Sequence, residues 1–469
     1  MINEEQEVST RGDKVVIAIL TAVMILGVFP MGGIRPFGVT ITFFWGIIPI
    51  IFVYFVVRRL RRGIATRQYT RTHLALALVF IFWLLWGGVL LFTSEYSLMM
   101  PGLKELIGIF FGLLCIFCID ESCNIKGGFS IMVTTLRIVI VGITILCLVE
   151  LVFGWHLYTS RFSNPTVIEE FIKALGKDYD GGAIAYDATG IFYNVNDLCA
   201  FLALFFPLFF PHRGNSILRN SAYILEMILL ILIISKDDAW ISLLAMGISG
   251  VGYLLIRRKN WKIWLISAIA FALIKEFVVK LFYGLVYIVY WLIPGVEVPF
   301  AVATMFGRSV SEDGLTAVVS AQLASAKMEK GSAFTRMENY KEGFTDLFTQ
   351  SGGMGLGPES YNRYMEMKHG YDLAMDPHCF WLEIMFQYGI VVFIAFVALL
   401  AYLFFRLVKN YRTTHRREYA VIIAIDLAFV ISSIAPSTYL GYEYSWIPIG
   451  LSLALAHIKL EKERKNRVI

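Results

Sequence analysis

Residues 379–405 read CFWLEIMFQYGIVVFIAFVALLAYLFF, an apolar run that contains one charged side chain, Glu383. Such a run is longer than the about 20 residues that a helix needs to cross the roughly 30 Å hydrocarbon core of a bilayer. Similar runs recur along the chain, so that apolar residues reach 58% of the sequence and charged residues only 16%. A soluble domain holds roughly 45–50% apolar and about 25% charged residues. We therefore predict an all-α polytopic membrane protein.

Hydropathy predicts about twelve transmembrane helices, which begin near residues 15, 38, 73, 103, 130, 191, 217, 239, 261, 379, 419 and 443. The first nine form a bundle over residues 1–293, and the last three occupy residues 379–469 with a basic tail. Between them lies one large loop, residues 294–378. Structureless loops of this length are uncommon in compact proteins, so we expect this one to contain helices and to carry function.

Lysine and arginine set the predicted orientation, because short cytoplasmic loops concentrate them. Basic patches follow the second, eighth, tenth and twelfth predicted helices. They contain Arg58, Arg59, Arg61, Arg62, Arg67 and Arg71; Arg257, Arg258, Lys259 and Lys262; Arg406, Lys409, Arg412, Arg416 and Arg417; and Lys459, Lys462, Arg464, Lys465 and Arg467. Both termini are therefore predicted to be cytoplasmic, and residues 154–190, 235–238 and 294–376 to lie outside. The formal net charge of +5 sits in these patches without a nucleic-acid motif, so we predict no nucleic-acid partner.

Three charges fall at a similar predicted depth inside the membrane: Arg137, Glu226 and Asp426. A charge at that depth usually finds a partner or a water-filled cavity. We predict that Arg137 pairs with one or both acids, either as a helix-packing ion pair or within a proton relay or transport path. Glu150, near the outer end of the fifth predicted helix, faces either water or the functional site.

The six cysteines predict packing rather than metal chemistry. Cys115 and Cys118 have the spacing of a zinc-binding pair, but no second pair or histidine accompanies them. In an apolar run cysteine packs as a small hydrophobic residue. We predict no metal and no cofactor.

The tripeptide Asp376-Pro377-His378 stands immediately before the apolar run at 379–405. Asp376 suits a helix N-cap and Pro377 the first helical position, which places His378 in the first turn. The helix dipole and free amide groups favour an anion such as phosphate there, and a neutral imidazole can accept a proton. The alternative interpretation is a surface histidine.

Two other sequences also admit a structural and a functional interpretation. Lys236, Asp237 and Asp238 form a very short outer turn, either as substrate-facing charges or as a solvated cluster that ends two helices. Residues 352–358, GGMGLGP, are rich in glycine, but no strand precedes them and no Lys-Ser or Lys-Thr follows. We interpret them as a turn rather than a nucleotide loop.

Five short motifs occur in one order on the predicted outer side. They are Asn194-Val195-Asn196-Asp197, residues 235–240 (SKDDAW), Arg336-Met337-Glu338-Asn339-Tyr340, residues 355–358 (GLGP), and residues 378–383 (HCFWLE) followed by Gly389. In this combination the chain resembles the O-antigen ligase and polysaccharide polymerase superfamily (Wzy-like and WaaL-like proteins) of bacterial envelopes. The resemblance is strongest over residues 190–400.

The resemblance implies a fold similar to the GT-C transferases and a multi-pass protein of the bacterial plasma membrane. Members of the family transfer a glycan from undecaprenyl diphosphate at the outer face, without nucleotide sugar or metal. The implied partners are an undecaprenyl-diphosphate-linked oligosaccharide and membrane lipids, with a flippase and a chain-length regulator as candidate protein partners.

Carried over residue by residue, the resemblance implies Arg336 and His378 as catalytic residues. It implies substrate binding by Lys236, Asn194, Asn196 and Asp376. Arg336 and Lys236 would stabilise negative charge on the leaving diphosphate. His378 would accept the proton of the attacking hydroxyl, with Asp376 or Glu338 as alternatives. A direct displacement of this kind inverts the anomeric centre.

The sequence departs from the family pattern at several of these positions. Lys236 stands where the family usually has an arginine, and a point charge thus replaces a bidentate guanidinium. Tyr340 stands in place of a tryptophan, Cys379 in place of an asparagine and Val195 in place of a proline.

Three classes of function compete. We favour a polymerase, which extends lipid-linked repeats, over a ligase, which moves a finished chain to another acceptor. A transporter of lipid-linked oligosaccharide would use intramembrane charges such as Arg137 and Asp426. It would more naturally show repeated halves with interrupted helices, and we find no internal repeat. A structural scaffold is the remaining alternative.

Overall fold

The computed structural model describes residues 9–27, 29, 42–61, 70–163, 187–212, 214–237, 239–257, 340–369, 379–434, 436 and 440–457. The regular elements in these ranges are helices. They are α1 (Arg11–Leu26), α2 (Phe43–Arg61), α3 (Arg71–Thr93), α4 (Met99–Asn124), α5 (Gly128–Phe153), α7 (Val195–Phe205), α8 (Ile217–Lys236), α9 (Trp240–Arg257), α13 (Tyr361–His369), α14 (Phe380–Thr414), α15 (Arg417–Ser432) and α16 (Trp446–Ala456), with the 3-10 helices η3 (Arg161–Ser163), η5 (Phe206–Phe209) and η6 (Glu443–Ser445). Residues 340–351, within the predicted loop, are also helical. The predicted all-α class is confirmed for the described residues.

Seven of the described helices are long and apolar enough to cross a membrane: α2, α3, α4, α5, α8, α9 and α14. Four shorter helices, α1, α7, α15 and α16, stand where further spans were predicted. The span predicted near residue 261 and much of the predicted loop at 294–378 lie outside the described residues. The count of twelve and the loop boundaries therefore stay predictions.

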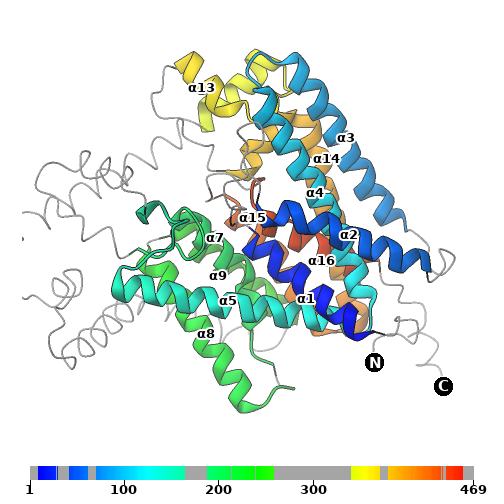
Figure 1. The fold of residues 1–469 in the computed structure, drawn as a ribbon, viewed down its shortest axis with the longest axis vertical. Coiled ribbons are helices and arrows are strands. Elements are labelled where there is room, and N and C mark those ends of the chain that lie inside the picture. The colour runs from blue at the N-terminus through cyan, green and yellow to red at the C-terminus, as the bar shows by residue number, and fades with distance from the viewer. Residues whose placement is uncertain are drawn as a thin grey trace, which may run out of the picture.

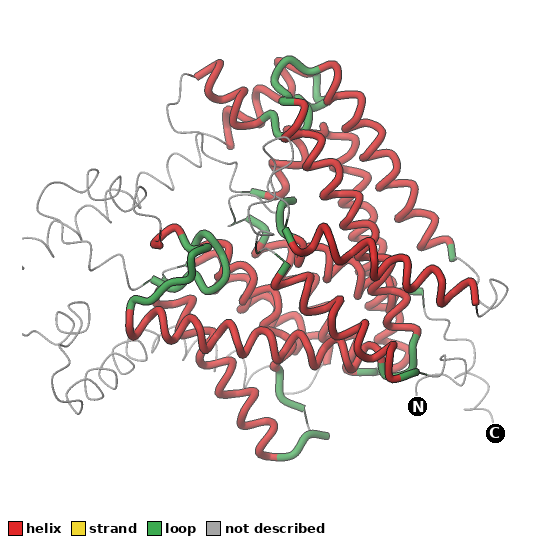
Figure 2. The backbone as a smooth tube through the Cα atoms, viewed as in Figure 1, coloured by secondary structure: helices red, strands yellow, loops and turns green. Residues whose placement is uncertain are grey.

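The helices form two groups joined by α15 (Figure 1). In the first group α4 packs against α3, α16 and α2, and α14 packs against α3. In the second group α7, α8 and α9 pack against one another, and α5 packs against α8. Helix α15 contacts both α9 and α14. Figure 2 shows short loops between α3 and α4, between α4 and α5, and between α14 and α15.

The outward-facing side chains of these helices are apolar. Leu85 on α3, Ile138 on α5 and Phe405 on α14 are 67%, 66% and 69% exposed. A bilayer core offers no water to backbone groups, so a spanning segment must satisfy them internally, as a helix does. Lipid contact explains exposed apolar residues on helices of this length.

Helix α14 is broken at Gly389, whose backbone has φ 86° and ψ 168°. The glycine-rich segment 353–358 lies against this break and replaces the lost helical hydrogen bonds. The N–H groups of Leu356 and Gly357 donate to Phe386 O at 2.9 Å and Gln387 O at 2.8 Å, and Ile390 N–H donates to Gly353 O at 2.9 Å. Backbone freed by a break in an apolar helix is thereby satisfied by protein.

On its other side the glycine-rich segment is hydrogen-bonded to α3 and to the turn between α3 and α4. Trp86 Nε1 donates to Met354 O at 3.0 Å, and Ser97 Oγ donates to Pro358 O at 2.8 Å. Ser94 Oγ donates to Leu356 O. The segment is a turn, as predicted, and the amides of Leu356 and Gly357 are occupied by protein acceptors rather than presented to a phosphate.

The predicted pairing of Arg137 with Glu226 or Asp426 is wrong. Arg137 Nε and Nη2 both donate to Leu208 O, at 3.0 and 2.7 Å, and its guanidinium lies 4.7 Å from the centre of the Tyr223 ring. The last carbonyls of a helix lack intrahelical partners, and Leu208 belongs to η5, which ends α7. A cation near such carbonyls is favourable, so Arg137 caps a helix end.

The two acids have neutral hydroxyl partners instead. Thr144 Oγ1 donates to Glu226 Oε1 at 2.7 Å. Ser452 Oγ lies 2.7 and 2.9 Å from the two carboxyl oxygens of Asp426. The three charges therefore face different neighbours, and the described structure contains no continuous relay among them.

Candidate functional site

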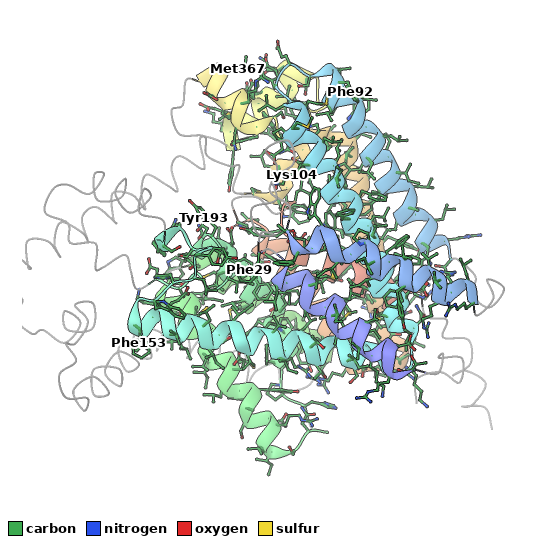
Figure 3. The ribbon with its side chains drawn as sticks, in the orientation of Figure 1. Phe29, Phe92, Lys104, Phe153, Tyr193 and Met367 are labelled. Carbon is green, nitrogen blue, oxygen red and sulfur yellow. The ribbon has the colours of Figure 1, made fainter. Side chains whose placement is uncertain are left out.

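Polar side chains gather where α5 and α8 end and α7 begins, at the end of the second helix group that is predicted to face outside. We call this set the outer polar cluster. It contains Glu150, His156, Arg161, Asp187, Asp197, Lys236 and Asp237. In Figure 3, Phe153 marks the end of α5 and Tyr193 the segment before α7, which border this cluster. Lys104 marks α4 of the first helix group.

Glu150 is the anchor of the outer polar cluster. This carboxylate is fully buried in the last turn of α5, and its Oε2 accepts hydrogen bonds from the backbone N–H groups of Thr189 at 2.8 Å and Gly190 at 2.6 Å. Its Oε1 lies 3.2 Å from His156 Nδ1 and 3.3 Å from Thr189 Oγ1. One buried carboxylate thus positions both connecting segments, 154–163 and 187–194, against α5.

Lys236 and Asp237, at the end of α8, also contact segment 187–194. Lys236 Nζ lies 3.0 Å from Asp187 Oδ1, with 17% of the lysine side chain exposed. Asp237 accepts a hydrogen bond from Ala188 N at 3.1 Å and caps the end of α8. Burial, and then the nearby Asp187 carboxylate, raise the pKa of Asp237. These residues are therefore partnered parts of a cluster rather than a freely solvated turn; Asp238 lies outside the described residues.

Arg161 supplies a second cation to the cluster. Its backbone N–H donates to Tyr193 O at 3.1 Å, and its guanidinium lies 4.7 Å from the centre of the Phe162 ring. Burial lowers the pKa of Arg161, while the carboxylates of Asp187 and Asp197 oppose this shift. Arg161, His156 and Asp187 were not predicted from the sequence, where their position in the predicted outer segment 154–190 was the available indication.

Asn194 and Asp197 of the first motif both make hydrogen bonds at the start of α7. Asn194 is the N-cap of α7, and its side-chain oxygen accepts a hydrogen bond from Asn196 N at 3.0 Å. Capping of this kind satisfies a free amide and typically stabilises a helix by about 1 kcal/mol. Asp197, one residue further, accepts a hydrogen bond from Tyr442 Oη and so ties α7 to the turn before α16.

The proposed catalytic residues cannot be placed in this cluster from the described structure. Arg336, Asp376 and His378 all lie outside the described residues, and Lys236 is the described member of the predicted cation pair. Among the described cluster residues, the four acids Glu150, Asp187, Asp197 and Asp237 exceed the two fixed cations Arg161 and Lys236. Glu150 and Asp197 are buried, at 0% and 1% exposed, whereas 36% of the Asp187 side chain is exposed, so Asp187 is open to solvent.

A second polar group lies at the α14 break, in the first helix group. Glu105 on α4 accepts hydrogen bonds from Tyr388 Oη at 2.5 Å and from Glu359 N at 3.0 Å. Turning the Gln387 amide so that its nitrogen faces Glu105 adds a third donor at 3.0 Å. Glu105 therefore joins α4 to α14 and to the end of the glycine-rich turn.

Glu443 is a buried acid between the two helix groups. It lies in η6, directly before α16, and is 8% exposed. Thr42 Oγ1 lies 3.5 Å from its Oε1, and no donor among the described residues reaches its Oε2.

Comparison with known proteins finds one informative relative. No protein-family model matches the chain. The chain is 25% identical over 399 residues to the teichuronic acid biosynthesis protein TuaE of Bacillus subtilis (strain 168), and the match covers 81% of this chain and 71% of that protein. The similarity therefore extends well beyond any single motif.

Proposed function

We propose that this chain is a membrane enzyme of cell-surface polysaccharide biosynthesis that polymerises undecaprenyl-diphosphate-linked oligosaccharide repeats. The observation that carries the proposal is the similarity to a teichuronic acid biosynthesis protein over most of the chain. The all-helical fold with apolar spans supports a membrane location. The order of the outer motifs, which resembles the O-antigen ligase and polysaccharide polymerase superfamily, supports the reaction class.

In the proposed reaction a sugar hydroxyl attacks the anomeric carbon of a second, diphosphate-linked repeat. The bond from that carbon to the diphosphate oxygen breaks, so the leaving group gains negative charge that Arg336 and Lys236 would stabilise. His378 would take the hydroxyl proton, with Asp376 or Glu338 as alternatives. Direct displacement inverts the anomeric centre.

In this proposal the Lys236–Asp187 ion pair opens when the diphosphate binds to Lys236. Asp187 is 36% exposed at its side chain, so the pair is open to solvent on one side. A bound diphosphate would compete with Asp187 for the ammonium group, and the released carboxylate would be available to a sugar hydroxyl. Asn194, which caps α7, and Asn196 beside it would line the same end of the helix.

A transporter is the second candidate, because broken helices such as α14 are typical of transporters. In those proteins the freed backbone groups at the break bind substrate or ion. Here the glycine-rich turn already occupies the groups of Phe386, Gln387 and Ile390. This arrangement favours the enzyme.

We expect Arg336→Ala to abolish long surface polysaccharide in the native organism. Loss of one cation from the leaving-group site should slow transfer by about 100-fold or more. Single lipid-linked repeats should then accumulate, measured by gel electrophoresis and mass spectrometry at matched protein level. Arg412→Ala, which changes an exposed arginine on the predicted inner side, is the control and should leave the polymer unchanged.

Two other outcomes would redirect the assignment. Accumulation of long lipid-linked chains in the Arg336 variant would indicate a ligase instead of a polymerase. Unchanged lipid-linked and surface glycans would remove Arg336 from the mechanism and leave transport as the function to test.

A further inference from the structure

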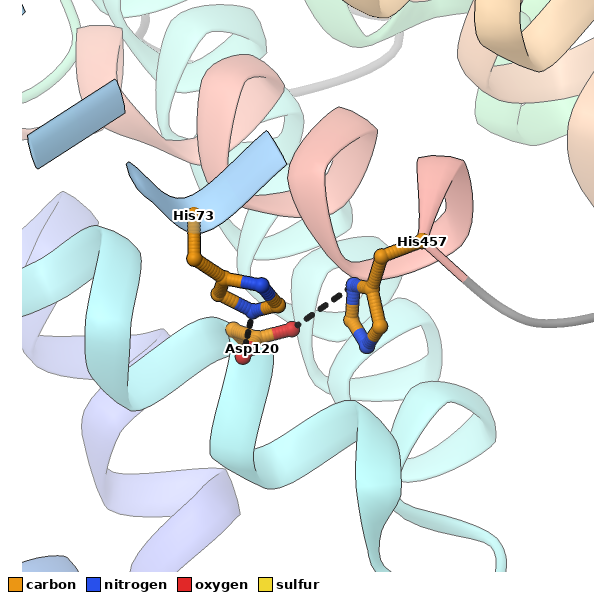
Figure 4. Close-up of side chains that lie close together, drawn as sticks. All are labelled: His73, Asp120 and His457. Atoms are coloured by element: carbon orange, nitrogen blue, oxygen red, sulfur yellow. Dashed lines mark hydrogen bonds and ion pairs between the residues drawn. The ribbon is translucent and has the colours of Figure 1, made fainter. Parts of the chain in front are cut away.

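Two histidines and one aspartate meet at the predicted inner end of the first helix group (Figure 4). His73 comes from the first turn of α3, Asp120 from the last turns of α4, and His457 directly follows α16. His73 Nε2 lies 3.2 Å from Asp120 Oδ2, and His457 Nδ1 lies 3.5 Å from Asp120 Oδ1. One potential ligand atom of each residue lies within 4.8 Å of the other two.

These spacings suit a transition-metal ion. Ligand atoms held at about 2.0–2.1 Å from a tetrahedral Zn²⁺ are separated by roughly 3.3 Å. The two histidine–aspartate distances, 3.2 and 3.5 Å, bracket this value, and they run to different carboxyl oxygens, Oδ2 and Oδ1, so each imidazole meets its own oxygen of Asp120. The two imidazole rings lie side by side with their centroids 4.6 Å apart, so both face the same carboxylate.

The three side chains are also held in place before any metal binds. Their exposed fractions are only 10% for His73, 3% for Asp120 and 9% for His457. His73 Nδ1 lies 2.8 Å from Thr70 Oγ1, the type of outer-shell partner that orients a ligating imidazole. Asn410 Nδ2 donates to Leu455 O at 3.0 Å and so fixes the end of α16 that carries His457.

The surrounding charges also bear on cation binding. Asp120 and His457 lie at the C-terminal ends of α4 and α16, where the helix dipole favours positive charge. Glu121, next to Asp120, is engaged with Arg59 at 2.8 Å, which leaves Asp120 as the carboxylate that faces the two imidazoles. Arg406 Nη2, 3.3 Å from Ala456 O, is the nearest cation that caps the same helix end.

We propose that His73, Asp120 and His457 form a binding site for Zn²⁺ or a similar transition-metal ion. Imidazole and carboxylate ligands are the set that such ions prefer, and three protein ligands leave a fourth position for water. In the metal-free chain Thr70 N–H donates to His73 Nδ1 at 3.2 Å, so His73 carries its ring proton on Nε2, beside Asp120. Metal binding through Nε2 moves this proton to Nδ1, where Thr70 Oγ1 can accept it. His457 Nδ1 donates to Leu453 O at 2.9 Å, so binding through Nδ1 breaks this hydrogen bond and moves the ring proton to Nε2.

The site would clamp three helices that are distant in sequence. A bound ion joins the start of α3 to the ends of α4 and α16, and it stabilises the folded chain by an amount that grows with metal concentration. The competing explanation is a metal-free network in which His73 Nε2 donates to Asp120 Oδ2 and His457 Nδ1 donates to Leu453 O. The two explanations differ in metal content, in spectrum and in metal-dependent stability.

The test uses the full chain, purified in detergent without a polyhistidine tag and stripped with a chelator. Added Co²⁺ should give the intense visible absorption of tetrahedral coordination at one ion per chain, and Zn²⁺ should displace it. Zn²⁺ should also raise the apparent Tm. Asp120→Asn and His457→Phe should weaken Co²⁺ and Zn²⁺ binding by at least about 10-fold, and Thr70→Val by about 10-fold through its partner His73.

The matched control is His415→Asn, which alters an exposed histidine at a left-handed backbone position that asparagine tolerates. It should bind both ions as wild type does. The wild-type spectrum requires no variant to fold, so it is decisive by itself. Absence of a stoichiometric Co²⁺ spectrum, or binding that is unchanged in Asp120→Asn and His457→Phe, would overturn the proposal in favour of the hydrogen-bonded network.

Discussion

Replacing Gly389 with alanine should prevent the chain from reaching its folded state in useful yield. The backbone of Gly389, at φ 86° and ψ 168°, lies in a region that is essentially restricted to glycine. A Cβ at this position would lie 2.4 Å from Met354 O and 2.5 Å from Met354 C. These are backbone atoms of the glycine-rich turn, so no side-chain rotation relieves the overlap.

The expected loss combines backbone strain of about 1–3 kcal/mol with separation of the turn from α14, so we expect at least about 3 kcal/mol in total. The measurement is the yield of monodisperse protein by size-exclusion chromatography, followed by its apparent Tm. Gly88→Ala and Gly142→Ala are the controls, because a Cβ at either position has no neighbour within 4 Å. Both should be neutral or slightly stabilising, since glycine is a poor helix residue. A normal yield and Tm for Gly389→Ala would show that the turn and the break are not tightly packed.

The sequence predicted helices better than it predicted what those helices face. Long apolar runs decide that α3, α5 and α14 are membrane helices, because length and hydropathy are local properties. The rotation of each helix about its axis depends on packing partners elsewhere in the chain. Arg137 faces Leu208 O and Glu226 faces Thr144, rather than each other.

In the candidate site, too, contacts between residues far apart in the sequence were not predicted. Asn194 stands directly before an apolar run, and in the structure it is the N-cap of α7. The partner of Lys236 was not predictable, because Asp187 stands 49 residues away in a segment without regular structure. His73, Asp120 and His457 are likewise brought together only by tertiary packing, and none of them has a motif of its own.

Glu150→Ala should have the largest effect of any single change in the outer polar cluster. It removes the acceptor of two buried backbone N–H groups, those of Thr189 and Gly190. An unsatisfied buried group costs about 1–3 kcal/mol, so the pair predicts a loss of roughly 2–5 kcal/mol. Segment 187–194 should then detach from α5, and polymer synthesis, if it depends on this cluster, should fall with it.

Glu150→Gln separates this positioning role from a need for charge. Both backbone N–H groups donate to the same oxygen, Oε2, so a glutamine carbonyl in that place can accept both, while its amide can donate to Thr189 Oγ1. We therefore expect the glutamine variant to lose only about 1 kcal/mol, the difference between charged and neutral acceptors. Hydrogen exchange of residues 187–194 should be fast in Glu150→Ala, near wild type in Glu150→Gln, and unchanged in Ile145→Ala, an exposed position on the same helix. If alanine and glutamine behave alike, Glu150 does not hold this segment through its hydrogen bonds. If glutamine preserves the slow exchange but abolishes polymer, the carboxylate charge itself takes part in the proposed reaction.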